Sequence, residues 1–421
     1  MQLKNIFSVI QNRAANFFLR GVSATSKFIA TVIFLKNGDP LFNNRIALIF
    51  TTVGLATSIL GLELNQIVNR KIHSFKKNDQ ILILKKEFFI HFICYIILFP
   101  IVFYFFHIRM ELDLYISLGI YFLLIFEHHN LELFRILISF LKPDLATQLL
   151  FLRTFFWILI VFVLTNFFGF RLDLHLIIFV WSFFSFLSVF VTYVKFKDQL
   201  IIALKGENVY LKELVSLIIE AKYFIGMLIF SSIISYLDKF ILNSNSNNNL
   251  TVYFFFFTVC SIISIVVSFS VGSFEGPKAI KVFALNGLND YIIEKVKLQK
   301  AYLNVIVATT ILLGIGIFPL LYFINKSEYW SNIHSFFILL ISASLYSFSD
   351  VYKLDIFIVK KDRLILTIFL IATVTNIILN FVLIRLFSVT GAAYASLFTN
   401  CLIYFKLKAS SKKVLNHFTN V

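Results

Sequence analysis

The sequence has few charged residues. Only 14% of its 421 residues are Asp, Glu, Lys or Arg, whereas 59% are hydrophobic. A soluble domain carries about 25% charged residues. No segment between the apolar runs is long enough to form a separate soluble domain. These absences exclude a soluble globular protein and predict a chain embedded in a membrane.

Cysteine and catalytic motifs are also scarce. The three cysteines, Cys94, Cys260 and Cys401, lie far apart inside apolar segments, which argues against a disulfide framework or a metal cluster. The adjacent pair His128 and His129 does not have the spacing of a metal site. The sequence has no phosphate-binding loop, no nucleophile elbow and no metal-ligand spacing. We therefore expect neither an enzyme nor a cofactor nor a bound metal.

Long apolar runs fill the chain from end to end. Runs of about 17 to 25 residues have the length that crosses a bilayer as a helix, and the short alternating segments of a transmembrane barrel are absent. We predict an all-α polytopic membrane protein with about 12 transmembrane helices. The expected spans are Ala14–Leu35, Arg45–Leu64, Phe88–Phe106, Leu112–Leu141, Leu145–Phe168, Leu174–Val194, Leu214–Leu242, Leu250–Val271, Ala301–Ile324, Ile333–Val359, Leu364–Leu386 and Val389–Phe405.

The net charge of +16 is distributed in a pattern that indicates membrane orientation. Of the 38 Lys and Arg residues, 27 lie at the two termini and in the even-numbered loops, 7 lie in the odd-numbered loops and 4 lie within spans. Cytoplasmic loops carry the excess of positive charge in membrane proteins. We therefore expect both termini in the cytoplasm, and we expect no nucleic-acid partner.

The chain shows signs of an internal repeat. The two longest connections each follow the second span of a six-span half. At an offset of 218 residues Glu132 and Arg135 superimpose on Asp350 and Lys353, so an acid is followed by a base three residues later in both halves. Parallel repeats of this kind build several transporter folds. We predict two six-helix lobes around a central cavity, residues 1–205 and 206–421.

The first span carries two cations in one polar stripe. Asn16, Arg20, Ser23, Lys27 and Thr31 are spaced by three or four residues and share a narrow face of a helix. Charged residues inside a membrane normally face a bundle interior or a watery cavity, and they are functional candidates by default. Lys27 is too central to reach the interface easily, so it is the strongest single candidate.

Other basic residues lie at a comparable depth on the cytoplasmic side. Arg153 and Lys222 lie about 12 Å from that end at about 1.5 Å per residue. If these side chains converge with Arg20 and Lys27, they form a cationic cavity that suits a diphosphate. An alternative is that some of them only extend to the interface or pair with nearby acids. The predicted substrate-binding residues are Arg20, Lys27, Arg135, Arg153, Lys222 and Lys353.

Four acidic residues are candidates for ion coupling or charge balance. Glu127, Glu132 and Asp350 lie near the middle of the membrane, and Asp238 ends the seventh span. Buried carboxyl groups can carry protons, so a proton gradient is one possible driving force. The alternative role is neutralisation of neighbouring basic residues.

Short motifs in a fixed order resemble those of the Wzx-type polysaccharide flippases, within the multidrug/oligosaccharidyl-lipid/polysaccharide exporter superfamily. The resemblance covers nearly the whole chain, although each motif is loose. The motifs are Gly61-Leu62-Glu63 after the second span, Asp238-Lys239-Phe240-Ile241-Leu242 with Tyr253, Pro277-Lys278 at the end of the eighth span, and Gly391-Ala392-Ala393-Tyr394-Ala395 opening the twelfth.

This resemblance implies a flippase of the bacterial inner membrane that works by alternating access. The implied substrate is undecaprenyl-diphosphate carrying one oligosaccharide repeat unit of an O-antigen or another surface polysaccharide, as in lipopolysaccharide. The implied partners are membrane lipid, a polysaccharide polymerase and a chain-length regulator. The alternatives are a polysaccharide polymerase, a drug exporter of the same superfamily and a membrane acyltransferase. The short outward loops and the basic spans argue against them.

The cationic stripe yields a first prediction. Lys27→Ala and Arg20→Ala should each abolish transport without preventing membrane insertion, because either change removes charge from the stripe. Surface glycan and membrane-inserted protein are measured in cells that carry each variant. Normal surface glycan in both single variants contradicts the cationic-cavity hypothesis.

Overall fold

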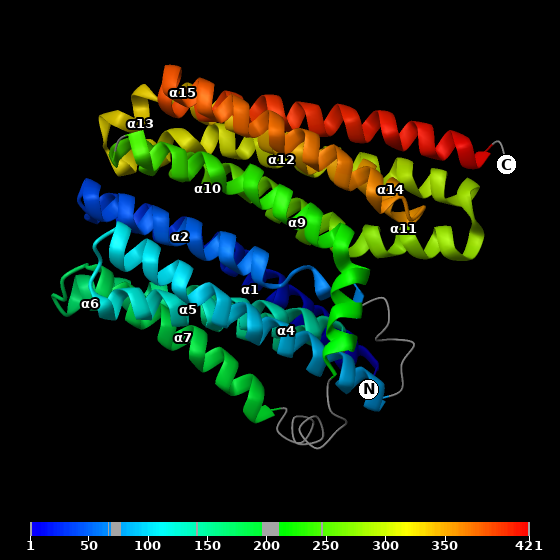
Figure 1. Ribbon diagram of the computed structural model, residues 1–421, viewed down its shortest axis with the longest axis horizontal. Coiled ribbons are helices and arrows are strands. Elements are labelled where there is room, and N and C mark those ends of the chain that lie inside the picture. Colours follow the sequence, from blue (N-terminus) through cyan, green and yellow to red (C-terminus); the bar gives the residue numbers. More distant parts are fainter. Residues whose placement is uncertain are drawn as a thin grey trace. The chain divides into compact units, whose positions relative to one another are not determined.

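The computed structural model describes residues 2–65, 67–68, 77–139, 142–195, 210–245 and 247–419. Every element in these ranges is a helix (Figure 1). The helices are α1 (Gln2–Asn37), α2 (Pro40–Leu60), α4 (Lys77–Phe103), η1 (Tyr104–Arg109), α5 (Leu114–Ser139), α6 (Pro143–Phe167), α7 (Leu174–Lys195), α9 (Leu211–Asn245), α10 (Asn247–Val267), η2 (Ser268–Gly272), α11 (Ser273–Asn286), α12 (Leu288–Ile324), α13 (Ser327–Ser331), α14 (Ile333–Ile358) and α15 (Asp362–Thr419).

These helices confirm the predicted all-α polytopic fold. Eight of them are long and apolar enough to cross a membrane. The longest, α15, contains a kink at Ser388, where φ is 51° and ψ is −122°, so it carries both the eleventh and the twelfth expected span. The first, second and fourth expected spans lie on α1, α2 and α5, which are helical but are not among the eight.

Large apolar side chains cover the outer faces of the helices. On α4, Phe92, Ile96, Ile97 and Ile101 are each about 60% exposed, at 59%, 59%, 60% and 59%. A soluble protein rarely exposes such a continuous apolar surface. Hydrocarbon is the solvent that suits it, which agrees with a multi-pass membrane protein.

Helix boundaries follow local chemistry. α6 starts with Pro143 at its first position, where a backbone N–H would have no acceptor within the helix, so proline costs no hydrogen bond there. Gly287 has φ 84° and separates α11 from α12, and this is a conformation that glycine adopts without strain. Asn325, in the left-handed conformation, ends α12.

The chain forms two compact units. Unit 1 contains residues 1–33 and 49–228, and unit 2 contains residues 34–48 and 229–421. The helices α1, α2 and α9 each contribute to both units. The expected boundary between residues 205 and 206 lies outside the described residues, so the division into two six-helix lobes stays a prediction.

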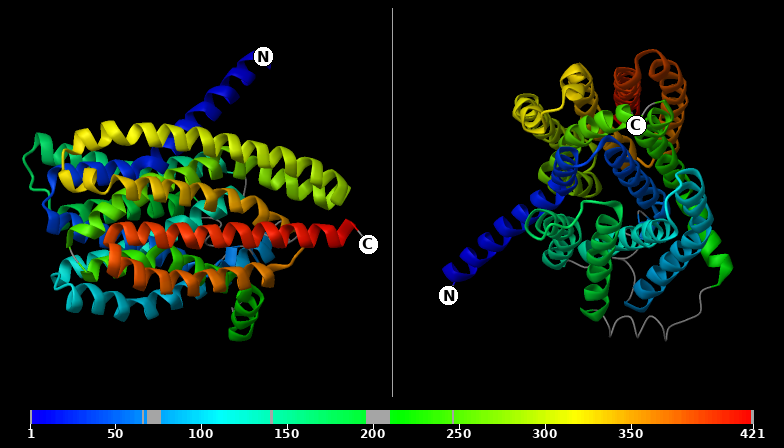
Figure 2. Two further views of the ribbon diagram at one scale, coloured as in Figure 1. Left: turned by 90° about the horizontal axis from the view of Figure 1, so that it is seen from above. Right: turned by 90° about the vertical axis from the view of Figure 1, so that its left-hand side faces the viewer.

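Unit 2 carries a helical hairpin beyond its apolar core. The connection between the eighth and ninth expected spans is α11 followed by the first turns of α12. Tyr291, Ala279 and Leu415 form a small apolar cluster there, joining α11, α12 and the last part of α15. Figures 1 and 2 show α11 and the C-terminus at the same end of this unit. The hydrogen bonds that Lys278 Nζ donates to Glu294 and Glu275 raise the pKa of Lys278, which keeps the α11 ammonium charged beside these carboxylates.

The small residues after the kink allow close packing. Ala392, Ala393 and Ala395 are fully buried. A Cβ atom on Gly391 would lie 1.9 Å from the backbone oxygen of Leu383. The two parts of α15 on either side of the kink therefore come into close contact at Gly391, where a side chain would not fit.

This contact predicts a stability effect. Gly391→Ala should destabilise the protein by about 1–3 kcal/mol, because the added methyl forces the backbone at the kink apart. The melting temperature of the purified protein in detergent should fall. Gly316→Ala on α12 is the matched control, since a Cβ atom there meets no atom within 4 Å. Equal melting temperatures for the two variants would contradict this account of the kink.

Candidate functional site

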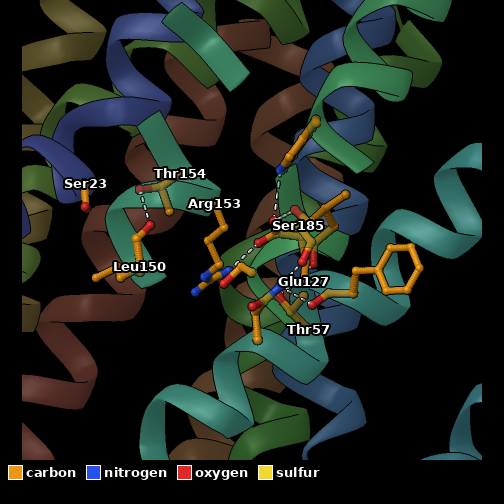
Figure 3. A network of polar contacts seen from close by, with 12 residues as sticks. Ser23, Thr57, Glu127, Leu150, Arg153, Thr154 and Ser185 are labelled. Carbon is orange, nitrogen blue, oxygen red and sulfur yellow. Dashed lines mark hydrogen bonds and ion pairs between the residues drawn. The ribbon is translucent and has the colours of Figure 1, made fainter. Parts of the chain in front are cut away.

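A buried ion pair joins α5 to α6 in unit 1. Arg153 Nη1 donates to Glu127 Oε2 over 2.5 Å. The other carboxylate oxygen accepts from Trp181 Nε1 at 2.9 Å and from Ser185 Oγ, both on α7. Figure 3 shows Glu127 between Arg153 and Ser185. Both carboxylate oxygens therefore have hydrogen-bond donors, and one of these donors is the Arg153 cation.

Stacked aromatic rings surround this pair. The rings of Trp157 and Trp181 are parallel within 11° and 4.9 Å apart, and the Phe50 ring packs edge-on against Trp181 at 5.2 Å. All three side chains are buried. The apolar wall lowers the local dielectric constant, which strengthens the Glu127–Arg153 attraction and raises the cost of breaking it.

The polar stripe of α1 faces the interior of unit 1. Arg20 Nε donates to Thr147 Oγ1 of α6 at 2.9 Å and lies within electrostatic range of Asp144. Lys27 Nζ lies 3.5 Å from the Phe50 carbonyl oxygen of α2 and 5.2 Å from the centre of the Phe50 ring. Both predicted cations thus contact neighbouring helices.

The remainder of the stripe follows the same face. Ser23 and Thr31 are 6% and 5% exposed. The side chain of Asn16 lies outside the described residues. The stripe predicted from sequence is therefore an inward-facing surface over its described part.

The acid–base repeat differs between the two halves. In unit 1, Arg135 Nη1 lies 2.5 Å from Glu132 Oε1. In unit 2, Asp350 and Lys353 are within electrostatic range, but they form no ion pair in the part of the chain that the structure describes, and Lys353 lies over the Phe369 ring at 5.6 Å. The same sequence spacing therefore yields two different local arrangements.

Asp238 lies in a buried network of unit 2. Its carboxylate is 3.2 Å from Lys239 Nζ and accepts a hydrogen bond from Tyr253 Oη, which also lies 3.1 Å from Ser396 Oγ. The Lys239 ammonium lies 3.5 Å from the centre of the Phe257 ring. Asp238 and Lys239 are each 1% exposed, so this carboxylate is neutralised by its own neighbour in sequence.

Lys222 has a different environment from the other basic candidates. Its side chain is exposed on α9 and lies 5.2 Å from the ring of the adjacent Tyr223. The predicted convergence of all six cations on one cavity spans both units and remains a prediction.

Sequence reasoning missed a second buried network in unit 2. Asp355 of α14 accepts from Tyr291 Oη at 2.5 Å, pairs with Lys295 Nζ at 2.7 Å and accepts a bond from Ser411 Oγ. Tyr291 and Lys295 are four residues apart at the start of α12, in the connection between the eighth and ninth expected spans. This spacing places Tyr291 and Lys295 on one face of a helix. It does not identify their partner, because Asp355 is 64 residues after Tyr291 in the sequence.

Comparisons with known proteins show the fold. No family model matches the sequence, and no curated protein matches it. The chain is similar to an inward-facing multidrug resistance MATE family transporter of the MOP superfamily, with a TM-score of 0.72, 11% identity, and coverage of 94% of this chain and 96% of that one.

Two further solved structures have the same fold. The lipid II flippase MurJ in an inward closed conformation matches with a TM-score of 0.71, 15% identity and coverage of 96% and 87%. A MATE structure in complex with MaL6 matches with a TM-score of 0.68, 12% identity and coverage of 96% and 95%. At these identities the similarity shows that the chain has the MATE and MurJ fold, and nothing about its substrate.

The Glu127–Arg153 pair predicts strong coupling. Arg153→Gln and Glu127→Gln should each destabilise the protein, Arg153→Gln by about 3–5 kcal/mol, because it leaves a buried carboxylate without its cation. The double variant should lose less than the sum of the two single losses, measured by thermal unfolding in detergent. Lys86→Gln is the control, since its ion pair with Glu213 is partly exposed and should change stability little. Additive losses in the double variant would contradict the coupling.

Proposed function

We propose that this protein is a flippase that translocates undecaprenyl-diphosphate-linked oligosaccharide repeat units of an O-antigen or another surface polysaccharide. Transport runs from the cytoplasmic to the periplasmic leaflet of the bacterial inner membrane, by alternating access and driven by an ion gradient. Both termini face the cytoplasm. The observation that carries the proposal is the inward-facing pair of cations on α1, Arg20 and Lys27.

The chemistry of the substrate matches these cations. A diphosphate carries several negative charges that must be compensated when they leave water. Arg20 presents a planar guanidinium that can hold two phosphate oxygens, and Lys27 presents a point charge two turns further along the same face. Their contacts include a hydroxyl and a carbonyl oxygen, and an incoming phosphate can replace these two.

The other predicted cations have different roles in this proposal. Arg153 and Arg135 are already paired with Glu127 and Glu132, so they would contact phosphate only at the cost of those pairs. We assign them to positioning and charge balance. Lys353 and Lys222 remain candidates for contacts with the substrate, and Asp238 and Asp350 for charge balance or ion coupling.

The fold supports transport and does not choose between substrates. One solved neighbour is a lipid II flippase and another is a multidrug transporter. Export of cationic drugs would favour an acidic surface, whereas the α1 stripe is basic. A polysaccharide polymerase would share the pathway and the implied partners, a chain-length regulator and the lipid-linked substrate, but it requires catalytic groups on the outer side.

Gene deletion followed by labelling tests the proposal. We expect the deletion to trap lipid-linked repeat units on the cytoplasmic side and to remove surface glycan, as measured with a membrane-impermeant label. The wild-type gene and a Lys195→Ala variant, changed at an exposed position on α7, should restore glycan. The double variant Arg20→Ala/Lys27→Ala should not restore it.

Other outcomes would replace the proposal. If single repeat units reach the outer face while long chains are lost, the protein acts as a polymerase. If glycan is unchanged and the deletion strain becomes sensitive to cationic drugs, it acts as a drug exporter.

A further inference from the structure

A cluster of buried titratable side chains lies between α4 and α5 of unit 1, against the end of α2. It is separate from the Glu127–Arg153 pair and from the α1 stripe. Its members are at most 8% exposed, and they are Glu87, His91 and Tyr95 of α4 with His128 and Glu132 of α5. A Cβ atom on Gly61, just after α2, would lie 3.0 Å from Glu132 Oε1 and 3.3 Å from His128 Nε2. Because Gly61 has no side chain, the backbone just after α2 can pack directly against the cluster.

Hydrogen bonds and ring contacts connect most of these groups. Tyr95 Oη lies 2.7 Å from His128 Nδ1, and the other nitrogen of the same ring lies 3.7 Å from Glu132 Oε1. The rings of His91 and His128 are perpendicular, with centres 4.8 Å apart. A continuous row of groups that can bind or release protons thus runs from Tyr95 to Glu132.

Glu87 differs from the other carboxylates of the protein that were singled out above. It is 1% exposed, and its Oε1 atom has no hydrogen-bond partner among the described residues. Among the described residues, Glu132 and Arg135 are the charged groups within its electrostatic range, and Arg135 is bound by Glu132. An ionised carboxylate that is buried in this way, without a described cation of its own, is very costly.

The described charged groups near the cluster come from three parts of the chain. Glu63 follows α2, Glu87 lies on α4, and Glu132 and Arg135 lie on α5. Other titratable side chains lie next to the cluster. Cys94 and Tyr121 are beside Tyr95. His129 of α5 is hydrogen-bonded to Tyr193 of α7. Of the charged groups, Arg135 is bound by Glu132, whereas Glu87 forms no ion pair with any residue that the structure describes.

A metal ion is not the natural ligand of this cluster. No three His, Cys, Asp or Glu side chains in the described ranges are arranged to hold a metal ion. A proton needs only one oxygen or nitrogen, and it removes the charge of Glu87 without any further ligand. The neutral carboxyl group then also gains an O–H donor in surroundings rich in acceptors.

We infer that this cluster is a proton-binding site in which Glu87 holds the proton and His91, His128 and Glu132 form its surroundings. The site couples a proton gradient to transport, and this part of the inference rests on the proposed function. Binding moves one proton from water to a carboxylate oxygen of Glu87, and release returns it to water. Glu127 is not needed for this step, because Arg153 already compensates its charge.

Infrared spectroscopy tests the proton site without any transport assay. The full-length protein in lipid nanodiscs at neutral pH should show the C=O stretching band of a protonated carboxyl group, and the band should shift in heavy water. Glu87→Gln should remove this band, and Glu87→Asp should keep it. Glu213→Gln, which changes a partly exposed carboxylate on α9 that pairs with Lys86, should leave it unchanged. A wild-type protein without the band, or a band that persists in Glu87→Gln, overturns the inference.

Transport into proteoliposomes tests the coupling. A gradient of one pH unit can raise accumulation by up to about tenfold for each proton carried. We expect the wild-type protein to show this stimulation and Glu87→Gln to lose it while retaining transport down a substrate gradient. If Glu87→Gln keeps the stimulation, or if only a sodium gradient stimulates the wild-type protein, the coupling role is wrong. If the wild-type protein moves no lipid-linked oligosaccharide at all, the proposed function fails, and the infrared result still decides the proton site.

Discussion

A charge that is removed from water into a membrane-embedded helix bundle must be paired or neutralised, and the interior of this protein is organised around that requirement. Glu127 and Arg153 show it most directly, since they lie on different helices and satisfy each other behind a wall of aromatic rings. In unit 2 the same need is met by Lys239 beside Asp238 and by Lys295 beside Asp355. The Glu127–Arg153 pair joins α5 to α6 and the Lys295–Asp355 pair joins α12 to α14, whereas Asp238 and Lys239 are adjacent on α9.

Two other sets of charged groups in unit 1 are the ones we connect with function. Arg20 and Lys27 contact a hydroxyl and a carbonyl oxygen on neighbouring helices, and we propose that they hold an anion. Glu87 has an oxygen without a hydrogen-bond partner among the described residues, and we assign it a proton. Anion binding and proton binding would thus use separate parts of unit 1, one on α1 and one between α4 and α5. The end of α2 lies near the second and Phe50 of α2 lies near the first, which offers a physical connection between them.

The acid–base spacing that occurs in both halves of the sequence leads to different contacts in the two units. Glu132 and Arg135 are in contact, whereas Asp350 and Lys353 share the same spacing without an ion pair among the described residues. Spacing along a helix determines which face a side chain occupies. It does not determine what the neighbouring helix offers, and in unit 2 the neighbour of Lys353 is the aromatic ring of Phe369.

The sequence by itself determined the helices and the inward direction of the α1 stripe. Apolar length specifies a membrane span, and a three-to-four-residue period specifies a polar face, and both are local properties. Only the tertiary structure decided the partners: Thr147 for Arg20, Glu127 for Arg153, and Asp355 for Tyr291. It also moved Glu87 from an expected connection into the buried part of α4. These contacts depend on which helices become neighbours and at what height, and that depends on packing between segments far apart in the chain.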